Sequence, residues 1–404
     1  MALDTSIRRH FPFCAAHPEI AYLDSAATTQ QPLVAIDAVH AAATRGIGGV
    51  HRGLHPLADA STSAFEHARK TCATFLGAAH VDEIIFTSGT TMGLNIVAHA
   101  LGTRFGEDDA IAVTVLDHHS NLTPWLALRE QRGVDLRWIG IDQYGTLKDD
   151  DIDRVFRDGR IRILAITGQS NVLGVRPDLP KLISIARAHK ALVCVDAAQY
   201  AAHAPINVQE LECDFLAFSG HKLYGPTGIG VLYGKRNLLA TMQPFITGGG
   251  MVRRVNEDGF TPADAPARFE AGTPNLLGAI GLAAALEWQQ QYSWEDRIEH
   301  ERSLLKLLLH ELRSVDGVHI LGPADQSVSG CVSFTIDNLH PHDMAELLGS
   351  KNACVRAGHH CAEPLHTALG IAASVRASVG LYTNRDDILA LAPAIRAAQT
   401  LLNR

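Results

Sequence analysis

Cys361 is the residue whose surroundings most suggest chemistry. It lies in a loop between Gly358 and Pro364 and follows two histidines, His359 and His360. A thiol in a polar, electropositive loop can ionise to a thiolate, which is the nucleophilic form of cysteine. A metal site is the alternative, but adjacent residues rarely converge on one ion and no second ligand pair has the right spacing. The sequence therefore favours a reactive thiol and predicts no metal.

Two further residues with chemical potential follow apolar runs that are typical of strands. Lys222 lies in a glycine-rich turn within 218–230 (FSGHKLYGPTGIG). An amine in a close-packed turn is partly removed from water, which lowers its pKa and suits it to Schiff-base chemistry. A solvated loop lysine is a weaker explanation there. Asp196 ends another apolar run, where a carboxylate can hold a cationic group, although a helix N-cap is also plausible.

The segment 87–95 (TSGTTMGLN) follows a predicted strand and opens a predicted helix. Free backbone N–H groups and the helix dipole make such a turn an anion site. Gly89 permits close approach of the backbone, and Thr90 and Thr91 add hydroxyl donors. An ordinary capped turn is the alternative, because the segment matches neither a P-loop nor a dinucleotide fingerprint.

Short apolar runs alternate with amphipathic stretches and predict the elements that position these residues. Strands are expected at 83–87, 110–115, 161–166, 191–195, 214–218 and 230–233, and helices at 92–101, 121–132, 179–189 and 274–292. Buried strands with helical crossovers are typical of an α/β fold with a mostly parallel sheet covered on both faces. Helices at 302–313, 342–348 and 386–402 and a strand at 330–335 predict a smaller α+β domain.

The domain prediction follows from this change of pattern. Residues 1–20 form an N-terminal segment that packs with the small domain, residues 21–292 a large domain and residues 293–404 the small C-terminal domain. A chain of 404 residues with 47% hydrophobic residues can bury such cores.

Composition excludes several functional classes. The net charge of −8 argues against general nucleic-acid binding. The seven cysteines are odd in number and contain no Cys-x-x-Cys pair, which favours a reducing compartment. We expect neither a signal peptide nor a membrane span, and hence a cytoplasmic protein.

Taken together, these segments resemble the fold-type I pyridoxal-phosphate enzymes of the class V aminotransferase family, and most closely the group II (SufS-type) cysteine desulfurases. The most specific pieces are 219–222 (SGHK), 268–275 (RFEAGTPN) and 356–361 (RAGHHC). The resemblance extends from Tyr22 to Tyr382. It implies the aspartate aminotransferase-like fold, with pyridoxal phosphate as cofactor.

The resemblance also assigns roles to individual residues. Lys222 would bind the cofactor covalently and move the substrate proton, and Cys361 would take the sulfur. The remaining cofactor contacts would come from His118 stacked on the ring, Asp196 at the pyridinium nitrogen, Gln199 at the phenolic oxygen, Thr90, Thr91, Ser219 and His221 at the phosphate, and Thr273 at the phosphate of a neighbouring subunit. The substrate contacts would come from Asn171 and Arg376 at the carboxylate, and from Arg356 and His51 in the pocket wall.

The implied function is conversion of L-cysteine to L-alanine by a homodimer. A persulfide would form on Cys361 and pass to a sulfur-acceptor protein for iron–sulfur cluster assembly. The alternatives are a selenocysteine lyase acting on L-selenocysteine, a class V aminotransferase or epimerase that does not use Cys361, and a non-catalytic scaffold. The intact Lys222, Asp196 and His118 argue against the scaffold.

Three positions need comment. Gly168, followed by Gln169, stands where the family usually has histidine, and Met92 replaces a commoner acidic residue. Both departures leave rate and substrate preference open. For Arg376 taken alone, a surface salt bridge of little energetic value is the plain interpretation.

Overall fold

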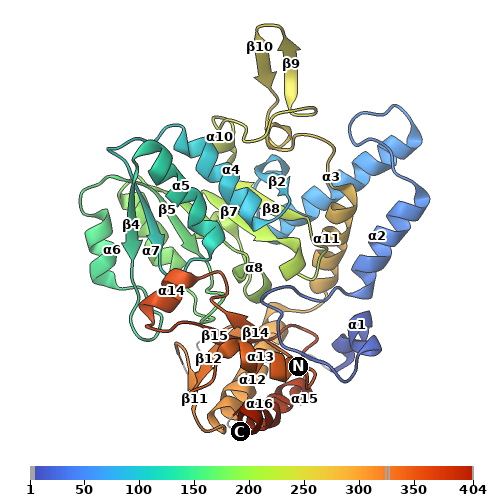
Figure 1. Ribbon diagram of the computed structural model, residues 1–404. Helices are drawn as coiled ribbons and strands as arrows, with labels where there is room; N and C mark the ends of the chain where they lie inside the picture. The colour runs from blue at the N-terminus through green and yellow to red at the C-terminus, as the bar shows by residue number, and fades with distance from the viewer. Residues whose placement is uncertain (1–4, 324, 326–327, 403–404) are drawn as a thin grey trace.

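The computed structural model in Figure 1 describes residues 5–323, 325 and 328–402. Its largest sheet has seven strands in the order β2-β8-β7-β6-β5-β3-β4. Their bounds are β2 (Ile84–Thr87), β3 (Ala110–Thr114), β4 (Asp135–Ile139), β5 (Ile161–Thr167), β6 (Leu192–Asp196), β7 (Phe215–Ser219) and β8 (Gly230–Gly234). Neighbouring strands pair in parallel except at β8, which is antiparallel to both β2 and β7. The predicted mostly parallel sheet is confirmed.

Helices cover both faces of this sheet because its strands are apolar on both sides. Ile84 and Leu164 face one buried cluster, while their neighbours Ile85 and Ile163 face another. The first cluster packs under α3 (Pro56–Leu76), α6 (Asp149–Phe156), α7 (Leu179–Ala188) and α11 (Leu276–Gln289). The second packs under α4 (Thr90–Gly102) and α5 (Thr123–Arg132). The elements predicted between residues 83 and 292 are present, with small shifts at their ends.

A four-stranded antiparallel sheet lies below the large sheet in Figure 1, in the order β11-β12-β15-β14. Its strands are β11 (Val318–Ile320), β12 (Cys331–Ile336), β14 (Arg356–Gly358) and β15 (Ser374–Ser378). The helices of this region are α12 (Trp294–Arg313), α13 (Pro341–Gly349), α14 (Glu363–Ala368), α15 (Arg385–Leu389) and α16 (Leu391–Leu402). The helix predicted at 386–402 is thus two helices, and the one predicted at 302–313 begins earlier, at Trp294.

The N-terminal residues join the two sheets. After η1 (Thr5–His10) and α1 (Pro12–Ala16), β1 (Ala21–Tyr22) pairs in parallel with β13 (Ala353–Cys354). Phe11 is buried and its ring lies 5.3 Å from that of Trp288 and 4.9 Å from that of Tyr382. The segment before residue 21 therefore packs on residues from both regions, and the division into domains stays a prediction.

The remaining elements are short, apart from α2 (Leu33–Arg45). They are η2 (Val81–Glu83), η3 (His119–Asn121), α8 (Tyr200–His203), α9 (Val208–Leu211), η4 (Gly220–Lys222), α10 (Arg236–Leu239) and η5 (Ala267–Phe269). A hairpin of β9 (Val252–Asn256) and β10 (Gly259–Pro262), which the sequence does not predict, projects from the body in Figure 1.

Candidate active site

A cavity of about 230 Å³ lies between the carboxyl ends of β6 and β7 and the C-terminal sheet. Ligands of open α/β sheets bind at such strand ends. Most of the predicted site residues line it: Thr90, Thr91, His118, Asn171, Asp196, Ser219, His221, Lys222, Arg356, Cys361 and Arg376. The fold thus brings together the four segments that the sequence analysis singled out.

One side of the cavity is the N-terminus of α4, which is built to take an anion. The backbone N–H of Thr90 donates to Ser219 Oγ over 2.8 Å, and the Thr90 and Ser219 hydroxyls lie 2.7 Å apart. Gly89, with a φ of 154°, precedes the helix, and a Cβ on Gly230 would lie 2.5 Å from the Gly89 Cα. Backbone and hydroxyl donors at the positive end of a helix dipole fit a phosphate.

Lys222 and Asp196 lie at the carboxyl ends of β7 and β6, which are neighbouring strands in the sheet. Lys222 lies in η4, directly after β7, and burial lowers the pKa of its amine, while Asp196 opposes that shift. Asp196 is the last residue of β6, and burial raises the pKa of its carboxyl. Its Oδ1 accepts from the Ala198 backbone N–H over 2.9 Å. A buried carboxylate of this kind is stabilised by a cationic partner.

His118 follows β3 and is held neutral. Burial, with Lys222 as the next cause, lowers its pKa to about 3. Its Nδ1 accepts from the Ser120 backbone N–H over 3.1 Å, so its single hydrogen is on Nε2. Asp117, which is fully buried, fixes this turn by accepting from the Thr114 backbone and from the Asn121 side chain.

Cys361 is held at the cavity by partners from the segments that follow β3 and β5. The backbone N–H of His119 donates to the Cys361 carbonyl over 2.7 Å. The side-chain amide of Asn171 donates to the carbonyl of His360, also over 2.7 Å. His360 and Cys361 both have positive φ, 53° and 57°. Five of the other cysteines are buried, as expected for packing residues, and Cys354 is half-buried.

Arg376 is buried, so its plain interpretation as a surface salt bridge is wrong. Its side chain is 1% exposed, and it donates to the Asn171 carbonyl over 2.9 Å and to Asp24 over 3.0 Å. Its Nε is buried without a hydrogen-bond partner. A guanidinium that keeps one donor free at a cavity suits a planar anion such as a carboxylate.

Three predicted residues lie outside this cavity within one chain. Gln199 is buried, and its amide donates to the Ala26 carbonyl over 2.7 Å. Thr273 lines a separate cavity of about 270 Å³ together with Met92. His51 is exposed, with its Nε2 3.1 Å from Glu66.

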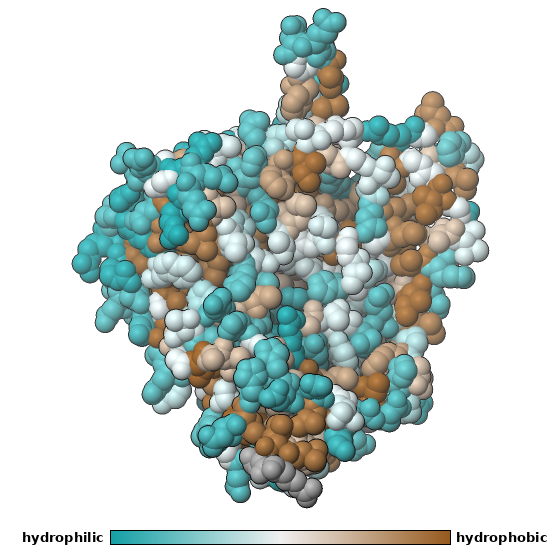
Figure 2. Space-filling model, viewed as in Figure 1, coloured by the Kyte–Doolittle hydropathy of each residue, from teal (hydrophilic) through white to brown (hydrophobic). Residues whose placement is uncertain are grey.

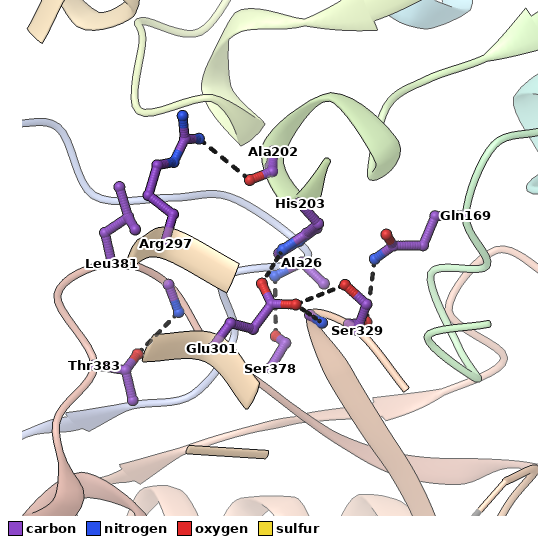
Figure 3. Close-up of polar contacts among 12 residues, drawn as sticks. Ala26, Gln169, Ala202, His203, Arg297, Glu301, Ser329, Ser378, Leu381 and Thr383 are labelled. Atoms are coloured by element: carbon purple, nitrogen blue, oxygen red, sulfur yellow. Dashed lines mark hydrogen bonds and ion pairs between the residues drawn. The ribbon is translucent and has the colours of Figure 1, made fainter. Parts of the chain in front are cut away.

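The Gly168 departure has a packing cause. A Cβ on Gly168 would lie 2.8 Å from the Cβ of Tyr200, and Gly168 does not line the cavity. Figure 3 shows that the next residue, Gln169, instead joins a polar cluster: its amide donates to the Ser329 carbonyl over 3.1 Å, and the Ser329 hydroxyl donates to Glu301. This cluster ties the segment after β5 to the region before β12.

His360, which the sequence analysis names beside Cys361, also lines the cavity. Sequence reasoning missed two other residues of the site: Ser120 lines the cavity and bonds the Thr91 hydroxyl over 2.7 Å, and Asp24 pairs with Arg376. Each adjoins a predicted residue or lies in a quoted motif, but only the fold shows which neighbour turns inward.

The described residues contain neither a metal-binding cluster nor a membrane-spanning helix. In residues 5–323, 325 and 328–402, no three histidine, cysteine or acidic side chains are grouped so that they could hold a metal ion. Within the same ranges, no helix is both long and apolar enough to span a membrane.

Comparisons of sequence agree with the motifs. The aminotransferase class-V family model matches residues 21–391. The chain is 42% identical to a probable cysteine desulfurase of Halalkalibacterium halodurans, over 93% of this chain and 92% of that one. It is also 42% identical to the cysteine desulfurase of Salmonella agona, over 95% and 94% of the two chains.

Solved structures agree with the fold. The cysteine desulfurase CsdA of Escherichia coli matches with a TM-score of 0.91 and 39% identity, over 99% of this chain and 100% of that one. The apo cysteine desulfurase of Thermococcus onnurineus matches with a TM-score of 0.93 and 37% identity, over 100% and 99% of the two chains. The chain therefore belongs to the class V aminotransferase family, where it groups with the cysteine desulfurases.

Proposed function

We propose that this chain converts L-cysteine to L-alanine and takes the sulfur as a persulfide on Cys361. The observation that most supports the proposal is that Cys361 and Lys222, distant in sequence, line one cavity. A thiol there is needed for sulfur transfer, whereas transamination needs only the lysine and the carboxylate.

The residues present fit pyridoxal phosphate, the cofactor of the family. The hydroxyls of Thr90, Thr91 and Ser219 and the N-terminus of α4 suit its phosphate, with His221 beside them. The Asp196 carboxylate suits its protonated ring nitrogen. When bound, the cofactor withdraws electrons from the substrate α-carbon, so that the α-proton becomes removable. Ring stacking by His118, the Gln199 contact and the contribution of Thr273 from a second subunit belong to this proposal.

Lys222 is the group that moves the α-proton. Removal of its amine from water lowers its pKa, so the neutral form that accepts a proton is more accessible than in a solvated lysine. Arg376, with its unpartnered Nε, holds the substrate carboxylate, and Arg356 adds positive charge to the same wall. The Asn171 side chain donates to the His360 carbonyl, and the Asn171 carbonyl accepts from Arg376. We therefore propose that Asn171 positions both residues.

Cys361 performs the sulfur transfer as a thiolate. Its Sγ bonds to the substrate sulfur, the substrate C–S bond breaks, and the electron pair of that bond stays with carbon. Protonation of that carbon gives the methyl group of alanine, and Cys361 keeps the sulfur as a persulfide. An acceptor protein then removes the sulfur from Cys361. We propose that this transfer takes place in the cytoplasm and supplies iron–sulfur cluster assembly.

A second copy of this chain is the proposed subunit partner. Figure 2 shows hydrophobic side chains gathered over α2 at the right of the molecule. The exposed large residues of α2, the loop after it and the start of α3 are Leu33, Val34, Ile36, Ile47, Leu54 and Leu57. An exposed apolar patch of this kind marks an interaction surface. Sedimentation of wild type and of Leu54→Asp tests the homodimer: dimeric wild type and a weakened variant are expected.

The function is tested by measuring alanine and sulfide released from L-cysteine with reductant, for wild type and Cys361→Ala in parallel. Equal amounts of both products from wild type, with cofactor bound but little product in the variant, are expected. Equal turnover by both proteins would refute the persulfide step. L-selenocysteine and a keto acid acceptor, run as further substrates, identify a selenocysteine lyase or an aminotransferase.

A further inference from the structure

Two buried polar residues behind the Cys361 loop have no part in the mechanism above. His366 lies in α14 and is 1% exposed, and Ser374 is the first residue of β15 and is 0% exposed. Ser374 pairs in the sheet with Gly358, close in sequence to Cys361. Buried polar groups are costly unless they are hydrogen-bonded, so their partners show what they do.

The partners form a chain of three hydrogen bonds that ends at His360. His366 Nδ1 lies 3.0 Å from the Ala362 carbonyl oxygen, and His366 Nε2 lies 3.0 Å from Ser374 Oγ. Ser374 Oγ lies 3.1 Å from His360 Nε2. His360 Nδ1 is buried and has no partner.

Both histidines are neutral, because burial lowers the pKa of His366 and brings that of His360 to about 2. A neutral imidazole carries one hydrogen. The Ala362 carbonyl only accepts, so the hydrogen of His366 is on Nδ1, and its Nε2 accepts from the Ser374 hydroxyl. That hydroxyl has no second hydrogen, so it accepts from His360 Nε2–H.

The chain of bonds thereby leaves His360 Nδ1 without a hydrogen. The one hydrogen of this ring is held by Ser374, so His360 has none to give to the substrate. Its role is to be held in place.

On the basis of the proposed function, in which Cys361 is the nucleophile, we propose that His366 and Ser374 are positioning residues for its thiol. The two bonds of Ser374 fix the ring of His360, and Asn171 fixes its carbonyl, so the residue is held at both ends. A left-handed conformation at two successive non-glycine residues persists only when the surroundings impose it. The held His360 thus sets the direction from which Cys361 enters the cavity.

The tautomers are tested by nitrogen-15 NMR of the histidine rings in the holoenzyme at pH 8, with signals assigned from His360→Gln and His366→Leu. We expect the hydrogen on Nε2 in His360 and on Nδ1 in His366. In His366→Leu the Ser374 hydroxyl loses its acceptor, so the ring nitrogen signals of His360, which this hydroxyl contacts, should shift. A wild-type His360 protonated on Nδ1, or His360 signals that are unchanged in the variant, would overturn this chain of hydrogen bonds.

The positioning role is tested by steady-state kinetics of alanine formation. Ser374→Ala should lower kcat about ten-fold, with KM and the cofactor absorption unchanged, because a misplaced nucleophile slows only the transfer. Ser374→Thr, which keeps the hydroxyl, should restore kcat. Ser333→Ala is the matched control, since it removes an equally buried hydroxyl on the neighbouring strand β12, where Ser333 donates to the Val172 carbonyl.

The outcomes separate this proposal from the function itself. Wild-type turnover together with an unchanged kcat in Ser374→Ala would refute the positioning role. If wild type forms no alanine while the NMR signals show the expected tautomers, the chain of hydrogen bonds from His366 to His360 is confirmed and the proposed reaction is refuted. If Ser374→Ala does not fold, the kcat of His366→Leu decides, with the same loss expected.

Discussion

The two walls of the cavity are held in different ways. The cofactor wall consists of residues at the ends of neighbouring strands, such as Asp196 and Ser219, whose positions follow from one buried sheet. The cysteine wall depends on bonds between distant segments: Asn171 to His360, and Arg376 to Asp24. Cofactor binding and sulfur transfer should therefore respond to different substitutions, although both walls enclose one cavity.

The largest effect is expected at Lys222, on the cofactor wall. Lys222→Ala removes the residue proposed as the covalent link to the cofactor and as the proton acceptor, so cysteine turnover should fall by about 10³-fold or more. Alanine formation and the cofactor absorption band are the measurements. Lys181→Ala, at a half-exposed lysine paired with Asp149, is the control and should retain full turnover. Turnover by Lys222→Ala within ten-fold of wild type would contradict this assignment.

The second largest effect is expected at Asn171, which lies on the cysteine wall. Asn171→Ala removes the amide that holds the His360 carbonyl, so kcat should fall about 10- to 100-fold through misplacement of the thiol. The cofactor absorption should not change. Asn207→Ala is a matched control, since it removes a half-buried helix cap outside the cavity. A loss of cofactor from Asn171→Ala would show that the two walls are not independent.

The same difference explains how much the sequence predicts. Local patterns indicated part of the cofactor wall: a strand end followed by glycine and hydroxyl residues suggests an anion site, and the strands of the large sheet were all predicted but β4. The resemblance was needed to choose this interpretation over an ordinary capped turn, and to add His118, Ser219 and His221.

Arg376 was identified by resemblance alone, because its burial depends on Asn171 and Asp24, far away in sequence. Ser374 and His366 carried no signal, since a buried serine and histidine acquire a role only through their partners.

Acid stability tests a property that both walls share, namely buried neutral histidines. The pKa of His118 is lowered to about 3 and that of His360 to about 2, while in the unfolded chain both are near 6.5. Below pH 6.5 the unfolded chain binds more protons, so the free energy of unfolding falls as pH falls. The slope is about 1.4 kcal/mol per pH unit for each histidine, and the contribution is fully present above pH 6.5.

Urea unfolding at pH 7, 6 and 5 measures this slope. His118→Gln should reduce it by the share of one histidine, and His360→Gln by the same amount. The exposed His319, paired with Asp337, is the control, and His319→Gln should leave most of the slope in place. A wild-type stability that does not change between pH 7 and 5 would mean that these two rings are not held neutral.

The smallest effect on activity is expected at Gly168, where this chain departs from the family and which does not line the cavity. Gly168→Ala places a Cβ 2.8 Å from the Cβ of Tyr200, so the protein should lose about 1–3 kcal/mol of stability. The kcat of the folded enzyme should not change, because Gly168 does not line the cavity. In a Tyr200→Gly background the same substitution should cost much less, since the Cβ, Cγ and Cδ1 atoms of Tyr200 that the new Cβ meets are all gone. Equal losses in both backgrounds would show that the glycine is required for its backbone rather than for the contact with Tyr200.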